Sequence, residues 1–406
     1  MKKVCLVTPG HISSNPRLVK EAIALENAGF CVHIVFTQYE PHLIKEDFHI
    51  LENHYSWRFD RLDWTNKTIK SKFKRTYSGL LNWLVNFIYT RTNFQFLLPY
   101  LLNRNFVWQK TLALKAKADL YIGHNLSVLP VVSIVGKKLK VKVGFDAEDF
   151  HRFETTDDKN SFHFKSCKKI EDEYIPKLDY LSAASPLIAK EYEILYGIHV
   201  LTINNFFPKS FVQDKFKKRD TSRLKLFWFS QTIGKNRGLE DVIEAMNQIS
   251  EFEIELHLLG KISSENRNFL LGFSHYQNRI FFYETISPDL LFDFSRQFDI
   301  GLALERKTPY NRNICLTNKI FTYLLGGLAV IASDTDAQID FMSNYPSFGL
   351  VYPIGDIIAL SNLLKKMYSQ NILESLQKGA ISLAQNNCNW ETEQSKYILK
   401  VKELLV

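Results

Sequence analysis

The sequence has few of the features that mark disulfide-rich, zinc-binding or membrane-spanning proteins. Its 406 residues include five cysteines, which are scattered, odd in number and free of CxxC or Cys/His metal spacing. This distribution predicts neither a disulfide framework nor a zinc site, and it favours a reducing cytoplasm. The segment 79–102 is apolar, but asparagines, an arginine and a proline interrupt it, which argues against a membrane-spanning helix.

Internal repeats and low-complexity tracts are also lacking. The apolar run that follows the two N-terminal lysines spans only six residues, too few for the apolar core of a signal peptide, and we expect it to form the first strand of a sheet. With 406 residues and 46% hydrophobic content, the chain has enough apolar side chains for sizeable cores, and its length favours two or three domains.

Acidic residues are nearly missing from one long window. The segment 61–117 contains eleven lysines and arginines but only one acid, Asp63, and it also holds eleven aromatic residues. The net charge of the whole chain is +8, so the rest of the chain is slightly acidic. A basic, aromatic, amphipathic surface is typical of proteins that bind an anionic membrane. In the other interpretation, the aromatic residues are ordinary core and the lysines form a solvated face.

The remainder alternates short apolar runs with helical spacing, which predicts an α/β protein with two successive Rossmann-like domains. We expect a first domain over 1–205 and a second over 206–386, with a linker in the polar and basic stretch 204–223 and a C-terminal helix, about 387–406, packed back on the first domain. The first domain opens with a strand over 4–8 and a helix capped by Asn15.

Two segments of the second domain predict an anion site. In Ser230–Glu240, SQTIGKNRGLE, a strand gives way to a glycine-containing turn and a helix, and backbone N–H groups at such a helix start bind a diphosphate. In Asn318–Asp334, NKIFTYLLGGLAVIASD, a helix capped by Asn318 ends at a pair of glycines, and a β-branched run then enters the sheet.

Five segments together resemble the two-domain GT-B glycosyltransferases, and most of all the retaining enzymes of glycosyltransferase family four. They are TPGHISSNPRLVKEAIALENAGFCVHIV near the N-terminus, DLYIGHNLSVLP, FDAEDFHRFE, SQTIGKNRGLE and LTNKIFTYLLGGLAVIASD. The resemblance implies two Rossmann-like domains facing across a cleft. It also implies metal-independent transfer of a sugar from a nucleotide diphosphate sugar, held by the second domain, to an acceptor held by the first.

The resemblance also implies residue roles in the donor site. Arg237 and Lys319 would stabilise the leaving diphosphate as its negative charge grows. In the simpler interpretation, each is a solvated cation near the start of a helix. Glu305 would contact a sugar hydroxyl or the phosphate loop, or else be a surface carboxylate paired with Arg306 or Lys307. The donor-binding residues predicted in this way are Gly10, Ser230, Gln231, Gly234, Glu305, Asn318 and Thr322.

Three positions depart from the common family pattern. Gln231 stands where many members carry an arginine, Thr322 stands where many carry a ribose-binding glutamate, and Cys315 stands where the first acid of a Glu-x7-Glu pattern falls. The donor site is therefore less charged than in those members, and these departures bear on which donor it takes.

In the first domain the strongest catalytic candidate is His124, which follows a predicted strand at the edge where an open α/β sheet presents functional groups. In similar enzymes a histidine here contacts the transferred sugar, whereas a lone histidine after a strand otherwise serves a structural hydrogen bond. We expect acceptor hydroxyls to be bound by Arg17, Glu148, Asp149 and His151. No metal site is expected, either at Asp146 and the acids after it or at the DTD of Asp334–Asp336.

The predicted function is thus a glycosyltransferase with a nucleotide-sugar donor and a glycan or lipid-linked acceptor, without a cofactor. It would work in the cytoplasm or peripherally at the inner face of a membrane, in envelope or polysaccharide biosynthesis. The alternatives are a GT-B nucleotide-sugar epimerase or phosphorylase and a non-catalytic nucleotide-sugar scaffold. Nucleic-acid binding is not expected, because the sequence has no RNA-binding signature.

Overall fold

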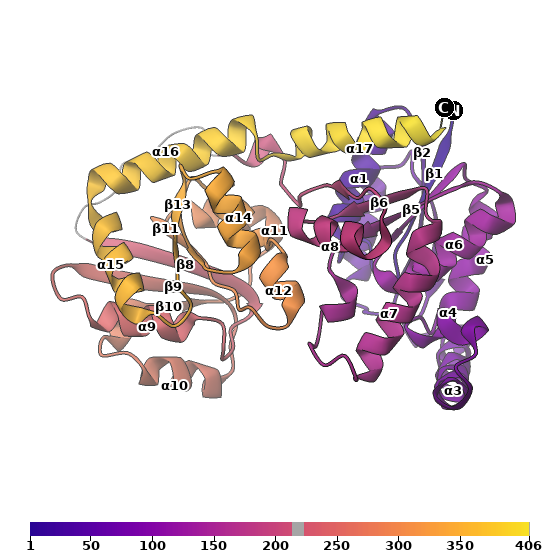
Figure 1. Ribbon diagram of the computed structural model, residues 1–406, viewed down its shortest axis with the longest axis horizontal. Helices are drawn as coiled ribbons and strands as arrows, with labels where there is room; N and C mark the ends of the chain where they lie inside the picture. The colour runs from indigo at the N-terminus through magenta and orange to yellow at the C-terminus, as the bar shows by residue number, and fades with distance from the viewer. Residues whose placement is uncertain (213–222, 406) are drawn as a thin grey trace. The chain divides into compact units, whose positions relative to one another are not determined.

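The chain folds into two compact units, shown in Figure 1 as a computed structural model. The structure describes residues 1–212 and 223–405, so half of the predicted linker and the last residue of the predicted C-terminal helix lie outside the described residues. Unit 1 comprises Met1–Asn204 together with the residues from Gln394 onward, and unit 2 lies within Asn205–Glu393. Each unit contains a parallel sheet with helices on it.

Unit 1 is built on a seven-stranded parallel sheet in the order β3-β2-β1-β4-β5-β6-β7. The strands are β1 (Lys3–Val7), β2 (Cys31–Gln38), β3 (Arg58–Asp63), β4 (Leu120–His124), β5 (Lys142–Ala147), β6 (Tyr180–Ala183) and β7 (Leu201–Thr202). The order reverses between β1 and β4. Ligands of open α/β sheets bind at the carboxyl ends of the strands beside such a reversal.

The helices of unit 1 connect these strands. They are α1 (Pro16–Asn27), α2 (Ile44–Asn53), α3 (Ile69–Thr92), α4 (Leu98–Leu101), α5 (Phe106–Ala116), α6 (Leu129–Leu139), α7 (Phe162–Tyr174) and α8 (Pro186–Tyr196), with short 3-10 turns η1 (Gln95–Leu97), η2 (Leu126–Val128), η3 (His151–Phe153) and η4 (Ile175–Lys177). Asn15 caps α1 as predicted, because its side chain accepts from the Leu18 N–H at 3.0 Å.

Unit 2 is built on a six-stranded parallel sheet in the order β10-β9-β8-β11-β12-β13, which reverses between β8 and β11. The strands are β8 (Arg223–Thr232), β9 (Glu253–Lys261), β10 (Ile280–Tyr283), β11 (Ile300–Ala303), β12 (Ala329–Ser333) and β13 (Gly349–Tyr352). The helices are η5 (Lys209–Phe211), α9 (Leu239–Asn247), α10 (Ser264–Gly272), η6 (Gln277–Arg279), α11 (Pro288–Ser295), α12 (Tyr310–Ile314), α13 (Asn318–Leu325), α14 (Asp336–Asn344), α15 (Ile357–Tyr368) and α16 (Gln370–Asn386). The last helix, α17 (Trp390–Leu405), runs from unit 2 into unit 1.

The central strands are continuous apolar runs in the sequence because they lie inside the two hydrophobic cores. Strands β1, β2, β4, β11 and β12 are buried almost throughout, because helices cover both faces of a parallel sheet. The core of unit 2 includes Leu226, Trp228, Leu256 and Ile331, and that of unit 1 includes Tyr121, Val131 and Val135.

The predicted fold class, two parallel-sheet α/β domains, is confirmed. The strand predicted over 4–8 is present as β1, Lys3–Val7. Two strands were not predicted, β3 and β13. Strand β3, RFDRLD, pairs only with β2 at the edge of the sheet, where one side of the strand is solvated and a polar sequence suffices. Within the described residues, no helix has the length and apolar character needed to cross a bilayer.

Candidate functional site

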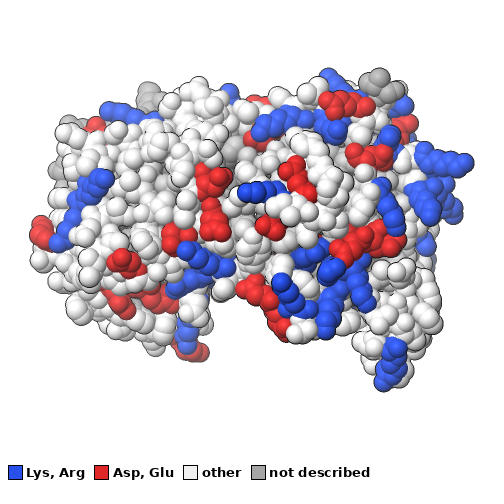
Figure 2. Space-filling view, viewed as in Figure 1, with Lys and Arg blue, Asp and Glu red and all other residues white. Residues whose placement is uncertain are grey.

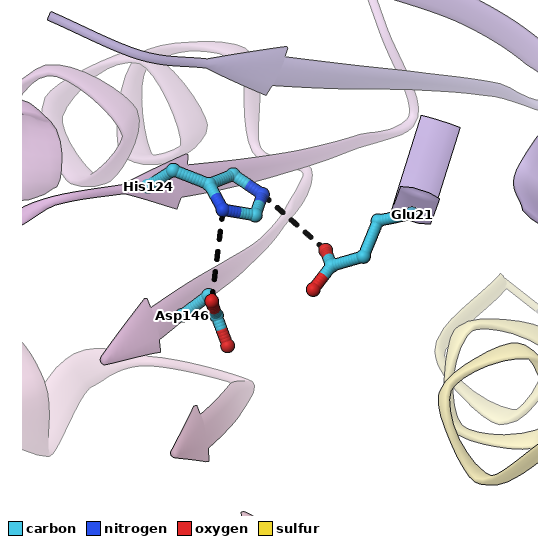
Figure 3. A group of neighbouring side chains, drawn as sticks. All are labelled: Glu21, His124 and Asp146. Carbon is cyan, nitrogen blue, oxygen red and sulfur yellow. Dashed lines mark ion pairs between the residues drawn. The ribbon is translucent and has the colours of Figure 1, made fainter. Parts of the chain in front are cut away.

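The carboxyl ends of β4 and β5 in unit 1 hold a buried cluster of ionisable side chains. His124, the last residue of β4, lies between Glu21 of α1 and Asp146 of β5 (Figure 3). Its Nε2 atom is 3.3 Å from Glu21 Oε2, and its Nδ1 atom is 3.6 Å from Asp146 Oδ2 and 3.5 Å from Glu148 Oε1. All of these side chains except Glu148 are essentially inaccessible to solvent. The predicted catalytic histidine is therefore a member of a charge network at the reversal of strand order.

Arg17 completes this network. Its guanidinium donates through Nε and Nη2 to the two oxygens of Asp146, at 2.5 and 2.7 Å, and through Nη1 to the Ile203 carbonyl at 2.6 Å. Ser182 on β6 also donates to Asp146, at 2.5 Å. A two-pronged contact of this kind fixes both partners, because the planar fork of arginine matches a carboxylate. Arg17, which was predicted to bind acceptor, thus binds a carboxylate of the protein itself.

The electrostatics of the cluster keep it charged. Burial alone would lower the pKa of His124, but the Glu21 carboxylate, with Glu148 and Asp146, outweighs burial and raises that pKa to about 10. Burial would likewise raise the pKa of Asp146, yet the Arg17 guanidinium next to it lowers that pKa to about 2. At neutral pH, His124 is thus a cation.

Neither ring nitrogen of His124 has a geometrically well-formed hydrogen bond within the described part of the chain. Its contacts with Glu21, Asp146 and Glu148 are longer than ordinary charge-assisted hydrogen bonds, which measure about 2.7–2.9 Å. The two ring N–H groups are therefore attracted to the nearby carboxylates, but each can still donate a hydrogen bond. Such a group can donate to a hydroxyl or to a developing negative charge, provided that the surrounding residues open to admit a ligand.

The three buried residues have the composition of a metal site, since one ligand atom from each of Glu21, His124 and Asp146 lies within 4.8 Å of the others. Their other contacts do not suit a cation. Arg17 donates to both oxygens of Asp146, and a protonated imidazole has no lone pair to offer a metal ion. The state that the structure shows is a charge-paired network and not a set of free ligands.

The other predicted acceptor-binding residues of unit 1 spread around the cluster. Glu148 is about one-third exposed and accepts from the Asn15 side chain at 2.9 Å, so it joins the start of α1 to the cluster. His151 is buried, but its Nδ1 atom faces Glu154 Oε2 at 2.9 Å, and that contact outweighs burial and raises the pKa of His151. Asp149 is half-buried. The structure brings Arg17 and Glu148 to His124, and it gives His151 a separate partner.

A second buried histidine in unit 1, His11, was not singled out from the sequence. Its Nε2 atom accepts from the N–H groups of Tyr39 and Glu40, both at 2.9 Å, so its Nδ1 carries the proton and donates to Asp47 at 2.6 Å. This network orders the turn that contains Gly10. A Cβ atom at Gly10 would be only in ordinary contact with the Tyr39 ring. His11 could have been identified as a candidate from the sequence by its position in the turn between the first strand and the first helix.

In unit 2 the segment predicted as an anion site forms a strand, a loop and a helix, with the loop between β8 and α9. Gly238 caps α9 in the left-handed conformation, with φ of 79°, and Arg237 immediately precedes it. Arg237 is half-buried and, across residues 1–212 and 223–405, has no hydrogen-bond or ion-pair partner. Ser230 and Gly234 are half-buried and Gln231 is exposed. An unpaired guanidinium beside the positive end of a helix is suited to a phosphate.

Two other donor-site candidates contact each other. Lys319 Nζ lies 2.7 Å from Glu305 Oε1, with both side chains mostly buried, and about 5.7 Å from the ring centre of Trp228. The backbone N–H of Glu305 donates to Ser333 Oγ at 2.8 Å, which holds the residue at the end of β11. The alternative interpretation, in which Glu305 is a surface carboxylate paired with Arg306 or Lys307, does not fit the structure, because Glu305 is mostly buried against Lys319 and Lys307 contacts Asp334 at 2.9 Å.

Helix α13 differs in detail from its prediction. Its N-cap is Thr317, and Asn318 is the first helical residue, so the predicted cap was one residue late. Asn318 is exposed, and its side chain accepts from Asn205 at 2.8 Å. Thr322 is buried and donates to the Asn318 carbonyl at 3.0 Å, within its own helix. The helix ends at Gly326 and Gly327 as predicted, with Gly327 at φ of 69°.

The acids of the DTD segment have protein partners. Asp334 accepts from the Ile354 N–H at 3.0 Å in addition to its contact with Lys307, and Asp336 accepts from the Asn313 side chain at 2.7 Å. These contacts account for both carboxylates as structural groups at the end of β12 and the start of α14.

No protein family matches the sequence, and no curated protein matches it either. Solved structures do match the fold. Sucrose-phosphate synthase from Thermosynechococcus elongatus is 14% identical with a TM-score of 0.70, covering 99% of each chain. Anabaena Alr3699/HepE in complex with UDP-glucose is 12% identical with a TM-score of 0.68, covering 98% of this chain and 99% of that one.

A third match in fold is a putative UDP-N-acetylglucosamine 2-epimerase from Listeria monocytogenes. It is 11% identical with a TM-score of 0.60, covering 99% of this chain and 96% of that one. At such identities the comparison establishes the fold, which is that of the GT-B glycosyltransferase structures.

Proposed function

We propose that the protein is a glycosyltransferase that takes a sugar from a nucleotide diphosphate sugar. The observation that carries this proposal is the unpaired, half-buried Arg237 at the start of α9, beside the reversal of strand order in unit 2. A cation without a protein partner at this place is available to pair with a ligand of opposite charge. A diphosphate fits, because the helix start adds N–H donors to the guanidinium.

The neighbouring ion pair would supply a second cation to the same anion. Lys319 is held by Glu305 at the carboxyl end of β11, next to β8 in the sheet. The family-four resemblance gives Lys319 the role of stabilising the leaving diphosphate, and the Glu305 contact would hold its ammonium in place until a donor binds. Fixed cations of this kind lower the barrier for loss of the diphosphate without requiring a metal ion, which supports a metal-independent mechanism.

Unit 1 contributes His124 to the proposal. Because its pKa is raised to about 10, the imidazolium is suited to donate a hydrogen bond to the transferred sugar or to the developing negative charge, and it is not suited to act as a general base at neutral pH. Retention of configuration by front-face attack is consistent with this role, since such attack needs no protein base on the opposite face of the sugar. Glu148, the more exposed carboxylate of the cluster, would accept from an acceptor hydroxyl.

The acceptor is proposed to be a glycan or a lipid-linked sugar of envelope or polysaccharide biosynthesis, at the cytoplasmic face of a membrane. The basic and aromatic window 61–117 supports this part of the proposal. An epimerase acting on a nucleotide sugar is the second candidate, because one of the structures that share the fold is that of a putative UDP-N-acetylglucosamine 2-epimerase.

A panel of nucleotide sugars tests the donor proposal by thermal shift. At a ligand concentration of about 100 Kd, binding to the folded state alone stabilises it by roughly 2.7 kcal/mol, and one sugar of the panel should raise the melting temperature accordingly. Arg237→Met should weaken that donor by about tenfold to a hundredfold, because it removes a charged hydrogen bond to phosphate. Lys235→Met is the matched control, since Lys235 is exposed and already paired with Glu265.

Product analysis then separates the two candidates. The hit from the panel is incubated with the protein, with and without a lipid-linked acceptor, and the products are identified by mass and by retention on a column. Transfer to the acceptor or slow hydrolysis to free sugar supports the transferase, whereas an isomeric nucleotide sugar formed without acceptor supports the epimerase. A protein that is stabilised by no nucleotide sugar contradicts both.

A further inference from the structure

Helix α3 is the most basic helix of unit 1 and contains no acid. Over Ile69–Thr92 it carries the cations Lys70, Lys72, Lys74, Arg75 and Arg91, and no aspartate or glutamate. The helix is well formed at both ends. Thr68 and Ser71 make a capping box, and Asn93 closes the helix in the left-handed conformation.

Only a narrow inner stripe of α3 faces the rest of unit 1. The buried positions of the helix are Ser71, Ser78, Val85 and Tyr89, which recur at helical spacing and therefore lie on one face. Contacts to neighbouring segments agree with this orientation. The Asn82 side chain donates to the Tyr100 carbonyl at 3.0 Å, and the Arg75 guanidinium donates to the Trp64 carbonyl at 3.1 Å. The inner face is thus small and partly polar.

The outer face of α3 is apolar, the reverse of the usual arrangement for a surface helix. Its members are more than 40% exposed, and they recur at intervals of three and four residues along the whole helix: Ile69, Phe73, Tyr77, Leu80, Trp83, Leu84 and Phe87. Rings stack along this face, Phe73 on Tyr77 and Trp83 on Phe87. Two more exposed aromatic residues, Phe94 and Phe96, follow the helix and stack on each other.

Positive charge borders this apolar face. Lys70, Lys72 and Arg91 are exposed on α3, and the Arg91 guanidinium lies 3.6 Å from the centre of the Phe87 ring. At the lower right of Figure 2, where α3 lies in the matching view of Figure 1, the surface shows white and blue without red. An apolar stripe bordered by cations and free of acids is the pattern of a helix that lies in a membrane interface.

We propose that this outer face of α3 docks the protein on an anionic lipid bilayer, with the helix lying in the plane of the interface. The apolar side chains would enter the boundary between headgroups and acyl chains, Trp83 and Tyr77 would sit at headgroup level, and the lysines would meet lipid phosphates. Charge selects this occupant over a second copy of the chain, because two α3 faces would place like charges together.

This inference rests on the proposed function and deepens it, because docking at a bilayer would bring the transferase to a lipid-linked acceptor. Docking itself requires no catalysis. Vesicle binding and glycosyl transfer can therefore fail independently: a protein that binds vesicles but takes no nucleotide sugar contradicts the proposed function alone, and one that transfers sugar but stays off vesicles contradicts the docking alone.

Flotation of the full chain with vesicles tests the docking. Vesicles of phosphatidylglycerol and phosphatidylcholine should carry the protein, and vesicles of phosphatidylcholine alone should carry much less. The triple variant F73S/L80S/W83S should lose at least about tenfold in partitioning, because three side chains no longer enter the interface. Its matched control is I194S/I358S/L399S. The control positions are 68%, 67% and 62% exposed, against 70%, 65% and 63% for the three on α3, and the control should float like the wild type.

The charge contribution is tested by K70Q/K72Q/R91Q, which should reduce partitioning by about two orders of magnitude and flatten its dependence on salt. Intrinsic fluorescence adds a readout at one residue. All six tryptophans are described, and Trp83 is the exposed one among them, so vesicles should shift the emission to the blue in the wild type and not in W83F. Thermal unfolding of each variant verifies that it is folded.

Three results would overturn the proposal. The first is equal flotation with neutral and anionic vesicles. The second is wild-type flotation by F73S/L80S/W83S. The third is a protein that ignores vesicles and sediments as a dimer that the same triple variant dissociates, which would assign the face to a second copy of the chain.

Discussion

At the scale of single residues, the most consequential contact is between Arg17 and Asp146. Two buried charges taken from water are costly, and their attraction offsets that cost only when the geometry is good and the remaining groups are satisfied. Both oxygens of Asp146 accept from Arg17, and Ser182 supplies a further donor. The pair therefore holds Asp146 ionised beside His124, where its charge adds to that of Glu21, the main group that raises the pKa of His124.

The charged state of His124 predicts how stability depends on pH. Its pKa is raised from 6.5 to about 10 in the folded protein, so the stabilisation from this group is fully present below pH 6.5 and is lost as the pH rises toward 10. The free energy of unfolding of the wild type should fall more steeply between pH 6.5 and 9.5 than that of His124→Gln. Urea unfolding across this range measures both slopes, and parallel curves would contradict the assignment.

The sequence located His124 but not the residue that charges it. A histidine at the end of a predicted strand is visible in the pattern, whereas Glu21 lies in the middle of α1 and resembles any helical acid. One signal was present. Arg17 and Glu21 are one helical turn apart. Because they are adjacent to the apolar positions Leu18, Ala22 and Leu25, the sequence predicts that both side chains face the sheet.

At the scale of elements, the packing of α13 against β11 controls where Lys319 lies. Gly301 on β11 faces the Tyr323 ring of α13, and a Cβ atom there would come within about 2.1 Å of that ring. The Tyr323 hydroxyl donates to the Leu302 carbonyl at 3.2 Å, which fixes the ring in place. The absence of a side chain at position 301 thus lets the helix approach the strand and brings Lys319 to Glu305.

Gly301→Ala should therefore destabilise the protein by about 1–3 kcal/mol through overpacking, and it should weaken nucleotide-sugar binding by moving α13. Chemical unfolding and the thermal-shift panel measure the two effects. Gly272→Ala is the matched control, because a Cβ atom at Gly272 meets nothing within 4 Å. It should be neutral or slightly stabilising, and equal losses in both variants would contradict the packing argument.

At the scale of the whole molecule, each unit has its own sheet and its own core, so the two should unfold as partly separate transitions. In scanning calorimetry, Asp146→Asn should lower one melting transition, because it leaves Arg17 buried without its partner at a cost of about 3–5 kcal/mol. Gly301→Ala should lower the other, and a bound nucleotide sugar should raise the transition that Gly301→Ala lowers. A single transition that responds equally to all three would show that the units unfold together.

Sequence by itself determined the fold class, because apolar runs alternating with helical spacing can bury their surfaces only as parallel sheets covered by helices. It also placed His124, Arg237 and Lys319 at strand ends and helix starts, since those boundaries carry local signals. Tertiary structure alone decided the partners. Glu21 meets His124, Arg17 meets Asp146 and Glu305 meets Lys319 across 103, 129 and 14 residues of chain, and no local pattern records which charges the folded sheet brings together.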